Sequence, residues 1–135
     1  MTREEKAEFL HRQGYNCAQA VACVFAEEAG IDESTMYKIS EGFGAGMGTA
    51  KGICGAVSGA AIVCGLVYSD GDTEHAGQTK MKTTRAAGNI QRKFTDEAKA
   101  LVCKDIKTGN NGAPFTSCAD CIKIAVRLTE EQLGL

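Results

Sequence analysis

The most hydrophobic run of the chain covers residues 52–68 and consists mainly of Gly, Ala, Val, Ile and Leu. Small residues recur in it at four-residue spacing, as at Gly55 and Gly59, and leave a shallow groove where another backbone can approach closely. The run is diluted by glycines and is shorter than the ~20 apolar residues that a membrane-spanning helix needs. We therefore predict a buried central helix and no transmembrane segment.

Apolar residues at helical spacing, bounded by capping residues and glycines, predict further helices on both sides of this run. These cover residues 2–14, 17–29, 34–39, 74–94, 95–103 and 118–133. No stretch shows the alternation of a strand, and 135 residues suit one domain. The expected fold is all-α, with residues 1–135 forming a single-domain irregular bundle of five to seven helices around the central Gly/Ala-rich helix.

Four glycines occupy every second position from Gly42 to Gly48, between two predicted helices. Such spacing permits positive φ values and predicts a loop. A phosphate-binding interpretation is weak, because no Gly-Lys-Ser/Thr follows. We expect the loop to fold closely over a helix or over a bound inorganic group.

The charges of the chain indicate no charged macromolecular partner. The net charge is -2, whereas binding to nucleic acid or an anionic membrane favours a large positive excess. The basic stretch at residues 80–93 lacks interleaved aromatics and predicts a solvated helix face, and His11 and His75 are expected at the surface. The amino terminus is charged and has no secretory signal pattern, so the expected compartment is the cytoplasm.

Seven cysteines are many for a domain of this size, and in a reducing compartment they favour metal ligation or redox chemistry. Cys17, Cys54 and Cys118 each fall in the first turn of a predicted helix. Unpaired N–H groups and the helix dipole stabilise a thiolate there and lower its pKa. Cys103 lies near the other end of its predicted helix and is the natural fourth partner. Converging helix starts would form a positive pocket suited to thiolates and to a group that they ligate.

Cys121 follows Cys118 at three-residue spacing and shares a helix face with it. The resulting C-x-x-C occurs in zinc, iron–sulfur and dithiol sites alike. Cys23 lies on a different helical face from Cys17, and Cys64 lies deep in the central run. We expect Cys23 and Cys64 to be buried free thiols that pack as small hydrophobic residues.

Five segments occur in a characteristic order: residues 16–21 (Asn-Cys-Ala-Gln-Ala-Val), the glycine-rich residues 42–48, residues 54–59 (Cys-Gly-Ala-Val-Ser-Gly), Cys103 and Cys118. Together they resemble the C_GCAxxG_C_C family of redox-active four-cysteine proteins, over nearly the whole chain. The resemblance implies redox activity without a defined substrate. It places the four family cysteines at Cys17, Cys54, Cys103 and Cys118. A similar module accompanies an iron–sulfur centre in split-Soret cytochrome c, but this chain has no C-x-x-C-H and thus no covalent haem is implied.

Three functions remain open from the sequence. In the first, Cys17, Cys54, Cys103 and Cys118, or Cys121 in place of Cys118, hold a [2Fe–2S] or [4Fe–4S] cluster that passes single electrons to an unknown partner. In the second, Cys54 or Cys118 attacks a disulfide and a neighbouring cysteine resolves the mixed disulfide, with Cys121 the obvious resolving residue for Cys118. The third is a structural zinc site, or a helical domain with reduced thiols and no chemistry. The small-residue face of the central helix could pair with the same face of a second copy and form a homodimer. A helix of the same chain could fill that groove equally well.

Overall fold

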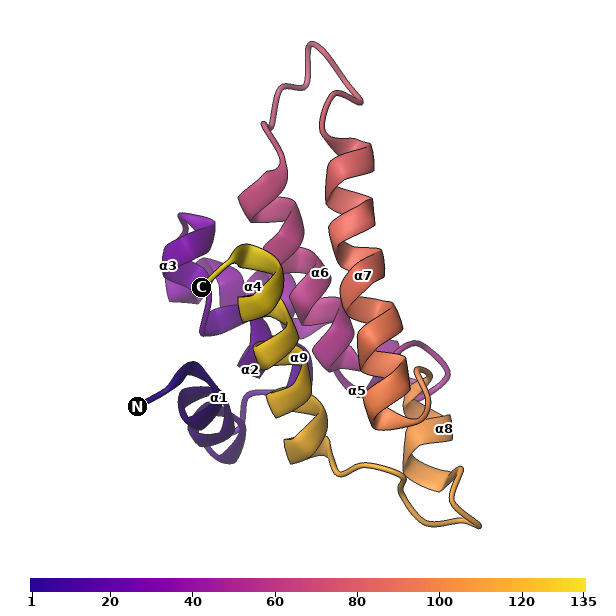
Figure 1. The fold of residues 1–135 in the computed structure, drawn as a ribbon. Helices are drawn as coiled ribbons and strands as arrows, with labels where there is room; N and C mark the ends of the chain where they lie inside the picture. Colours follow the sequence, from indigo (N-terminus) through magenta and orange to yellow (C-terminus); the bar gives the residue numbers. More distant parts are fainter.

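The computed structural model describes all residues 1–135 and consists of helices joined by turns and loops, without a strand (Figure 1). The all-α expectation is confirmed. The helices are α1 (Arg3–Arg12), α2 (Cys17–Cys23), α3 (Ala26–Ala29), α4 (Glu33–Glu41), α5 (Gly44–Met47), α6 (Gly55–Tyr68), α7 (Lys80–Ala98), α8 (Cys103–Thr108) and α9 (Cys118–Leu133). There are more segments than expected because the helix predicted at residues 17–29 breaks near Phe25, and because the glycine-rich loop contains the short turn α5.

Helix α6 lies at the centre of the fold, as the hydrophobic run predicts. It packs against α2, α7 and α9, and its buried hydrophobic residues belong to one core cluster of 26 residues. Figure 1 shows α6 and α7 as an antiparallel pair whose connecting loop projects from the body, with α9 beside them. None of the nine helices has the length and apolar character required to cross a bilayer.

The groove of small residues on α6 is filled by α2 of the same chain. A Cβ atom added at Gly59 would lie 2.5 Å from the carbonyl oxygen of Ala18, and one added at Gly55 would collide with the Sγ atom of Cys17. The two helices therefore approach backbone to backbone, and this approach brings Cys17 to the start of α6. The homodimer stays a prediction. Helix α2 occupies the groove at Gly55 and Gly59, so a second copy would have to contact another part of α6.

The crossing of α2 and α6 predicts opposite effects for two Gly→Ala substitutions in one helix. Gly59→Ala should lower the free energy of unfolding by about 1–3 kcal/mol, because the new methyl group overpacks against Ala18. Gly65→Ala should raise it by up to about 1 kcal/mol, because a Cβ atom there meets no atom within 4 Å and alanine favours helix. Urea denaturation measures both, and equal stabilities would contradict this packing.

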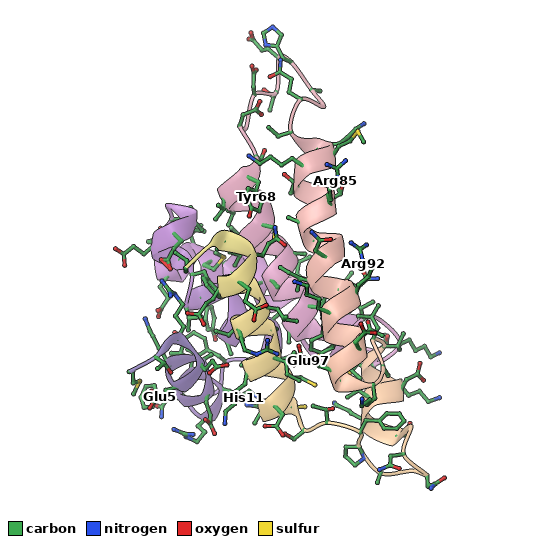
Figure 2. All side chains as sticks on the ribbon, in the orientation of Figure 1. Glu5, His11, Tyr68, Arg85, Arg92 and Glu97 are labelled. Carbon is green, nitrogen blue, oxygen red and sulfur yellow. The ribbon has the colours of Figure 1, made fainter.

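Helix α7 begins and ends differently from the helices predicted in this region. Its start is delayed to Lys80 because the side chains of Asp70 and Asp72 accept backbone N–H bonds from residues two positions later and favour turns. It continues to Ala98 and ends at Lys99, which has a left-handed φ of 77°. The basic residues of α7 are exposed as expected, and Figure 2 shows Arg85 and Arg92 pointing away from the body.

The helix predicted at residues 95–103 is correct only as far as Ala98, because residues 95–98 form the last turn of α7 and residues 99–102 are not helical. Ile53 and Val102 form an isolated antiparallel bridge, and the N–H of Cys54 donates to the carbonyl oxygen of Leu101 at 2.8 Å. Cys103 then becomes the first residue of α8. It therefore lies at a helix start and not at a helix end.

Candidate functional site

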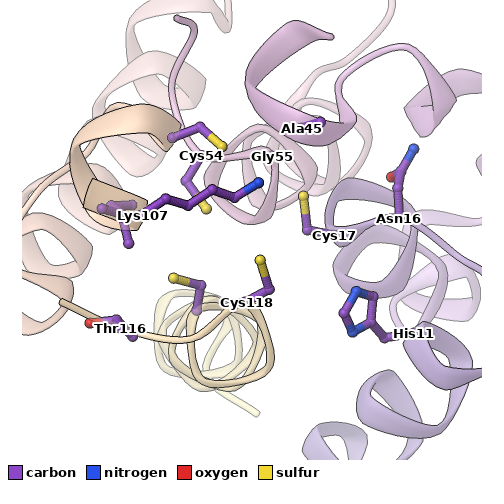
Figure 3. Close-up of a pocket in the computed structure, with 12 residues that line it drawn as sticks. His11, Asn16, Cys17, Ala45, Cys54, Gly55, Lys107, Thr116 and Cys118 are labelled. Carbon is purple, nitrogen blue, oxygen red and sulfur yellow. The ribbon is translucent and has the colours of Figure 1, made fainter. Parts of the chain in front are cut away.

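Five of the seven cysteines line one cavity of about 210 Å³ (Figure 3). This volume is many times the roughly 10–15 Å³ that a single water molecule requires. The lining cysteines are Cys17, Cys54, Cys103, Cys118 and Cys121. Every cysteine singled out as a candidate ligand thus reaches the same space. Cys23 and Cys64 are 2% and 0% exposed within the core, which confirms them as packing residues.

Four of these cysteines lie at the starts of four different helices. Cys17, Cys103 and Cys118 are the first residues of α2, α8 and α9, and Cys54 is the N-cap residue of α6. Helix starts carry unpaired N–H groups and the positive end of the helix dipole, and both favour a bound anion. The cavity is therefore surrounded by more helix starts than the sequence predicts, since Cys103 joins the three expected ones.

Capping residues fix two of these helix starts. The side chain of Asn16 accepts a hydrogen bond from the N–H of Gln19 at 2.9 Å, and the side chain of Gln19 accepts one from the N–H of Asn16. The two bonds form a capping box at the start of α2. The Ser117 hydroxyl accepts from the N–H of Asp120 at 3.0 Å at the start of α9. Local sequence signals thus determine where Cys17 and Cys118 enter their helices.

The glycine-rich loop lies closely against the starts of α2, α6 and α8, as expected of a loop that folds over a helix, and Ala45 lines the cavity. Ala45, Gly46 and Met47 have φ values of 54°, 59° and 61°, in the left-handed region that alanine and methionine rarely adopt. This path directs the N–H of Ala45 to the thiol of Cys17 and leaves no room for a side chain at Gly46, where a Cβ atom would lie 2.6 Å from the Cβ of Cys103. Backbone strain of this kind is typical of functional sites.

Cys54 and Cys121 form a hydrogen-bonded pair inside the cavity. The Cys121 thiol donates to Cys54 and lowers the pKa of Cys54, an effect that the N–H groups of Ala56 and Val57 reinforce against the cost of burial. The same hydrogen bond and burial raise the pKa of Cys121. The two side chains are 7% and 3% exposed. Within this buried pair the thiolate form is therefore favoured at Cys54 and disfavoured at Cys121.

The expected lowering of the thiol pKa at helix starts is found for Cys54 and is wrong for Cys17. Burial raises the pKa of Cys17 and outweighs the opposing hydrogen bond from the N–H of Ala45. Burial also raises the pKa of Cys103, against the opposing charge of Lys107. The position at a helix start alone does not decide the protonation of these thiols, because desolvation of the charged form is the larger effect at two of them.

Two cavity residues were missed by the sequence analysis. Lys107 lies on α8, and Figure 3 shows its side chain reaching into the space between the cysteines. His11 was expected at the surface, yet it is half-buried and lines the cavity beside Cys17. Neither position carries a sequence signal, because α1 and α8 reach the cavity only through tertiary packing.

The cavity thiols surround an open space and do not gather at one point. No three His, Cys, Asp or Glu side chains are arranged to hold a single metal ion. A zinc site needs its thiolate sulfurs at about 2.3 Å from one centre.

A comparison with protein-family models gives one match. The model described as "Putative redox-active protein (C_GCAxxG_C_C)" matches residues 15–132, a range that contains all five cavity cysteines. No curated protein and no solved structure matches the chain.

Proposed function

The chain belongs to the C_GCAxxG_C_C family, described as redox-active, and from this premise we propose that its cavity holds a cysteine-ligated iron–sulfur cluster that passes single electrons. The observation that carries the proposal is the convergence of four cysteine-bearing helix starts on one cavity. Four thiolates are the ligand set of both [2Fe–2S] and [4Fe–4S] clusters. Such a cluster would supply one-electron chemistry at this site.

Cys17, Cys54, Cys103 and Cys118 would be the ligands. They enter the cavity from α2, α6, α8 and α9, so the donors surround the space from several directions. Cys121 follows Cys118 by one turn of α9 and also lines the cavity, and it is the alternative to Cys118 as the fourth ligand. The N–H groups of the helix starts and of Ala45 would offset the negative charge of the thiolates and tune the reduction potential.

Cys118 marks the side from which an electron partner would approach. It is the exposed member of the ligand set, whereas Cys54 and Cys103 are 7% exposed. A ligand sulfur at the surface shortens the path to a docked partner. We therefore expect electrons to enter and leave at the start of α9.

The test is reconstitution of the purified protein with iron and sulfide under anaerobic conditions. We expect brown protein with a broad visible absorption band, iron and sulfide in a fixed ratio to the chain, and bleaching on one-electron reduction. A colourless, iron-free preparation would overturn the proposal. Bound zinc without a redox couple would overturn it as well and would support the structural zinc site instead.

The hydrogen-bonded pair of Cys54 and Cys121 favours a second candidate function, thiol–disulfide exchange. The Cys54 thiolate would attack a disulfide substrate and release one thiol, and Cys121 would then displace the second thiol from the mixed disulfide. One substrate disulfide is thereby reduced to two thiols while the two cysteines become one disulfide. The contact favours Cys54 as the partner of Cys121, whereas the C-x-x-C spacing favours Cys118.

A further inference from the structure

We propose that Lys107 is the counter-cation of the cavity, a positioning residue whose ammonium balances the negative charge of the bound group and raises its reduction potential. The part that concerns the potential rests on the proposed function. Figure 3 shows the Lys107 side chain extending from α8 into the space bordered by Cys17, Cys54 and Gly55. The twelve residues that line the cavity include five cysteines and no carboxylate.

The fold fixes the direction of Lys107. It lies four residues after Cys103 on α8, so the two side chains share one helix face, and the charge of Lys107 lowers the pKa of the Cys103 thiol against the larger effect of burial. The start of α8 is held by bonds from Cys103 N–H to Gly52 at 3.0 Å and from Lys104 N–H to Ala50 at 2.8 Å. These bonds fix the position of α8, and α8 in turn places the Lys107 side chain at the cavity.

Lys107 has no carboxylate partner elsewhere. It takes part in none of the ion pairs of the structure. The charge of Lys107 lowers the pKa of Cys54, together with the larger effect of Cys121, and it lowers the pKa of Cys103 against the larger effect of burial. The cavity thiols are thus groups on which the charge of this ammonium acts.

The sign of the effect follows from electrostatics. Reduction adds one electron to a group that its thiolate ligands already make negative, and a cation nearby favours the reduced form. Removing the charge should therefore lower the reduction potential. We expect at least a tenfold shift of the one-electron equilibrium, which corresponds to 59 mV.

The experiment compares Lys107→Gln with Lys107→Arg, which keeps the charge, and with Lys104→Gln, an exposed lysine of the same helix that does not line the cavity. In reconstituted protein, dye-mediated redox titration should give a lower potential for Lys107→Gln alone. Equal potentials in wild type and Lys107→Gln would overturn the role of Lys107 in setting the potential.

A second readout uses the metal-free, reduced protein and does not depend on a cluster. The rates at which negatively charged iodoacetate and neutral iodoacetamide alkylate the cavity cysteines are compared by peptide mass spectrometry. Because both reagents react with the same thiolate, their rate ratio reports the local charge. Lys107→Gln should lower the iodoacetate/iodoacetamide ratio by about threefold or more, and Lys107→Arg should restore it. An unchanged rate ratio in Lys107→Gln would overturn the role of Lys107 as counter-cation. Failure of the wild-type protein to assemble a cluster would instead overturn the proposed function.

Discussion

Cys54→Ala should abolish iron and sulfide binding, while Cys64→Ala should leave both unchanged. Cys54 lies at the N-cap of α6 and faces the cavity, whereas Cys64 lies two to three turns further along the same helix and is fully buried in the core. Both substitutions remove one thiol from the α6 region, but only Cys54→Ala removes a thiol from the cavity. Iron and acid-labile sulfide per chain after anaerobic reconstitution measure the effect, with circular dichroism as the control for folding.

The same measurement separates Cys118 from Cys121 as the fourth ligand. Cys17→Ala, Cys103→Ala and Cys118→Ala should each lose the cluster, and Cys121→Ala should retain it. Loss of iron in Cys121→Ala together with retention in Cys118→Ala would place Cys121 in the ligand set. Retention of full iron content in Cys54→Ala would contradict the site altogether.

Metal-free protein should form one intramolecular disulfide between Cys54 and Cys121 when it is treated with a low-molecular-weight disulfide such as oxidised glutathione. The two thiols lose two electrons and two protons, and the reagent is reduced to two thiols. Their side chains interact directly in the cavity, so this pair needs little rearrangement to join. Peptide mapping without reduction, over a series of glutathione redox buffers, measures the disulfide and its potential.

Two single substitutions control this experiment. Cys121→Ala should eliminate the disulfide completely, and Cys118→Ala should leave it intact. A disulfide between Cys118 and Cys121 in the wild-type protein would contradict the pairing seen in the cavity. Since Cys54 cannot be a cluster ligand and a disulfide partner at once, the reconstituted protein should resist this oxidation at Cys54.

The parts of the fold that the sequence predicts correctly are those that local signals determine. The apolar run that forms α6 predicts that this helix is buried. Asn16 and Ser117 are capping residues that place Cys17 and Cys118 at helix starts. The spaced glycines predict the close loop because Gly46 must admit the side chain of Cys103. Helix type and caps depend on neighbouring residues in the chain, and the spaced glycines predict a close approach without identifying its distant partner.

The parts that could not be predicted depend on tertiary contacts. Lys99 ends α7 in a left-handed conformation that the sequence gives no reason to expect, and the bridge between Ile53 and Val102 then makes Cys103 a helix start. The contact between Cys54 and Cys121 arises where α6 packs against α9. The raised pKa of Cys17 reflects burial, which a capping pattern does not report.

The most direct test of the central claim is anomalous X-ray diffraction at the iron absorption edge on crystals of the anaerobically reconstituted protein. The account predicts iron density inside the cavity, bonded to the sulfurs of Cys17, Cys54, Cys103 and Cys118. Iron elsewhere, or an iron-free cavity with Cys54 and Cys121 joined in a disulfide, would contradict it.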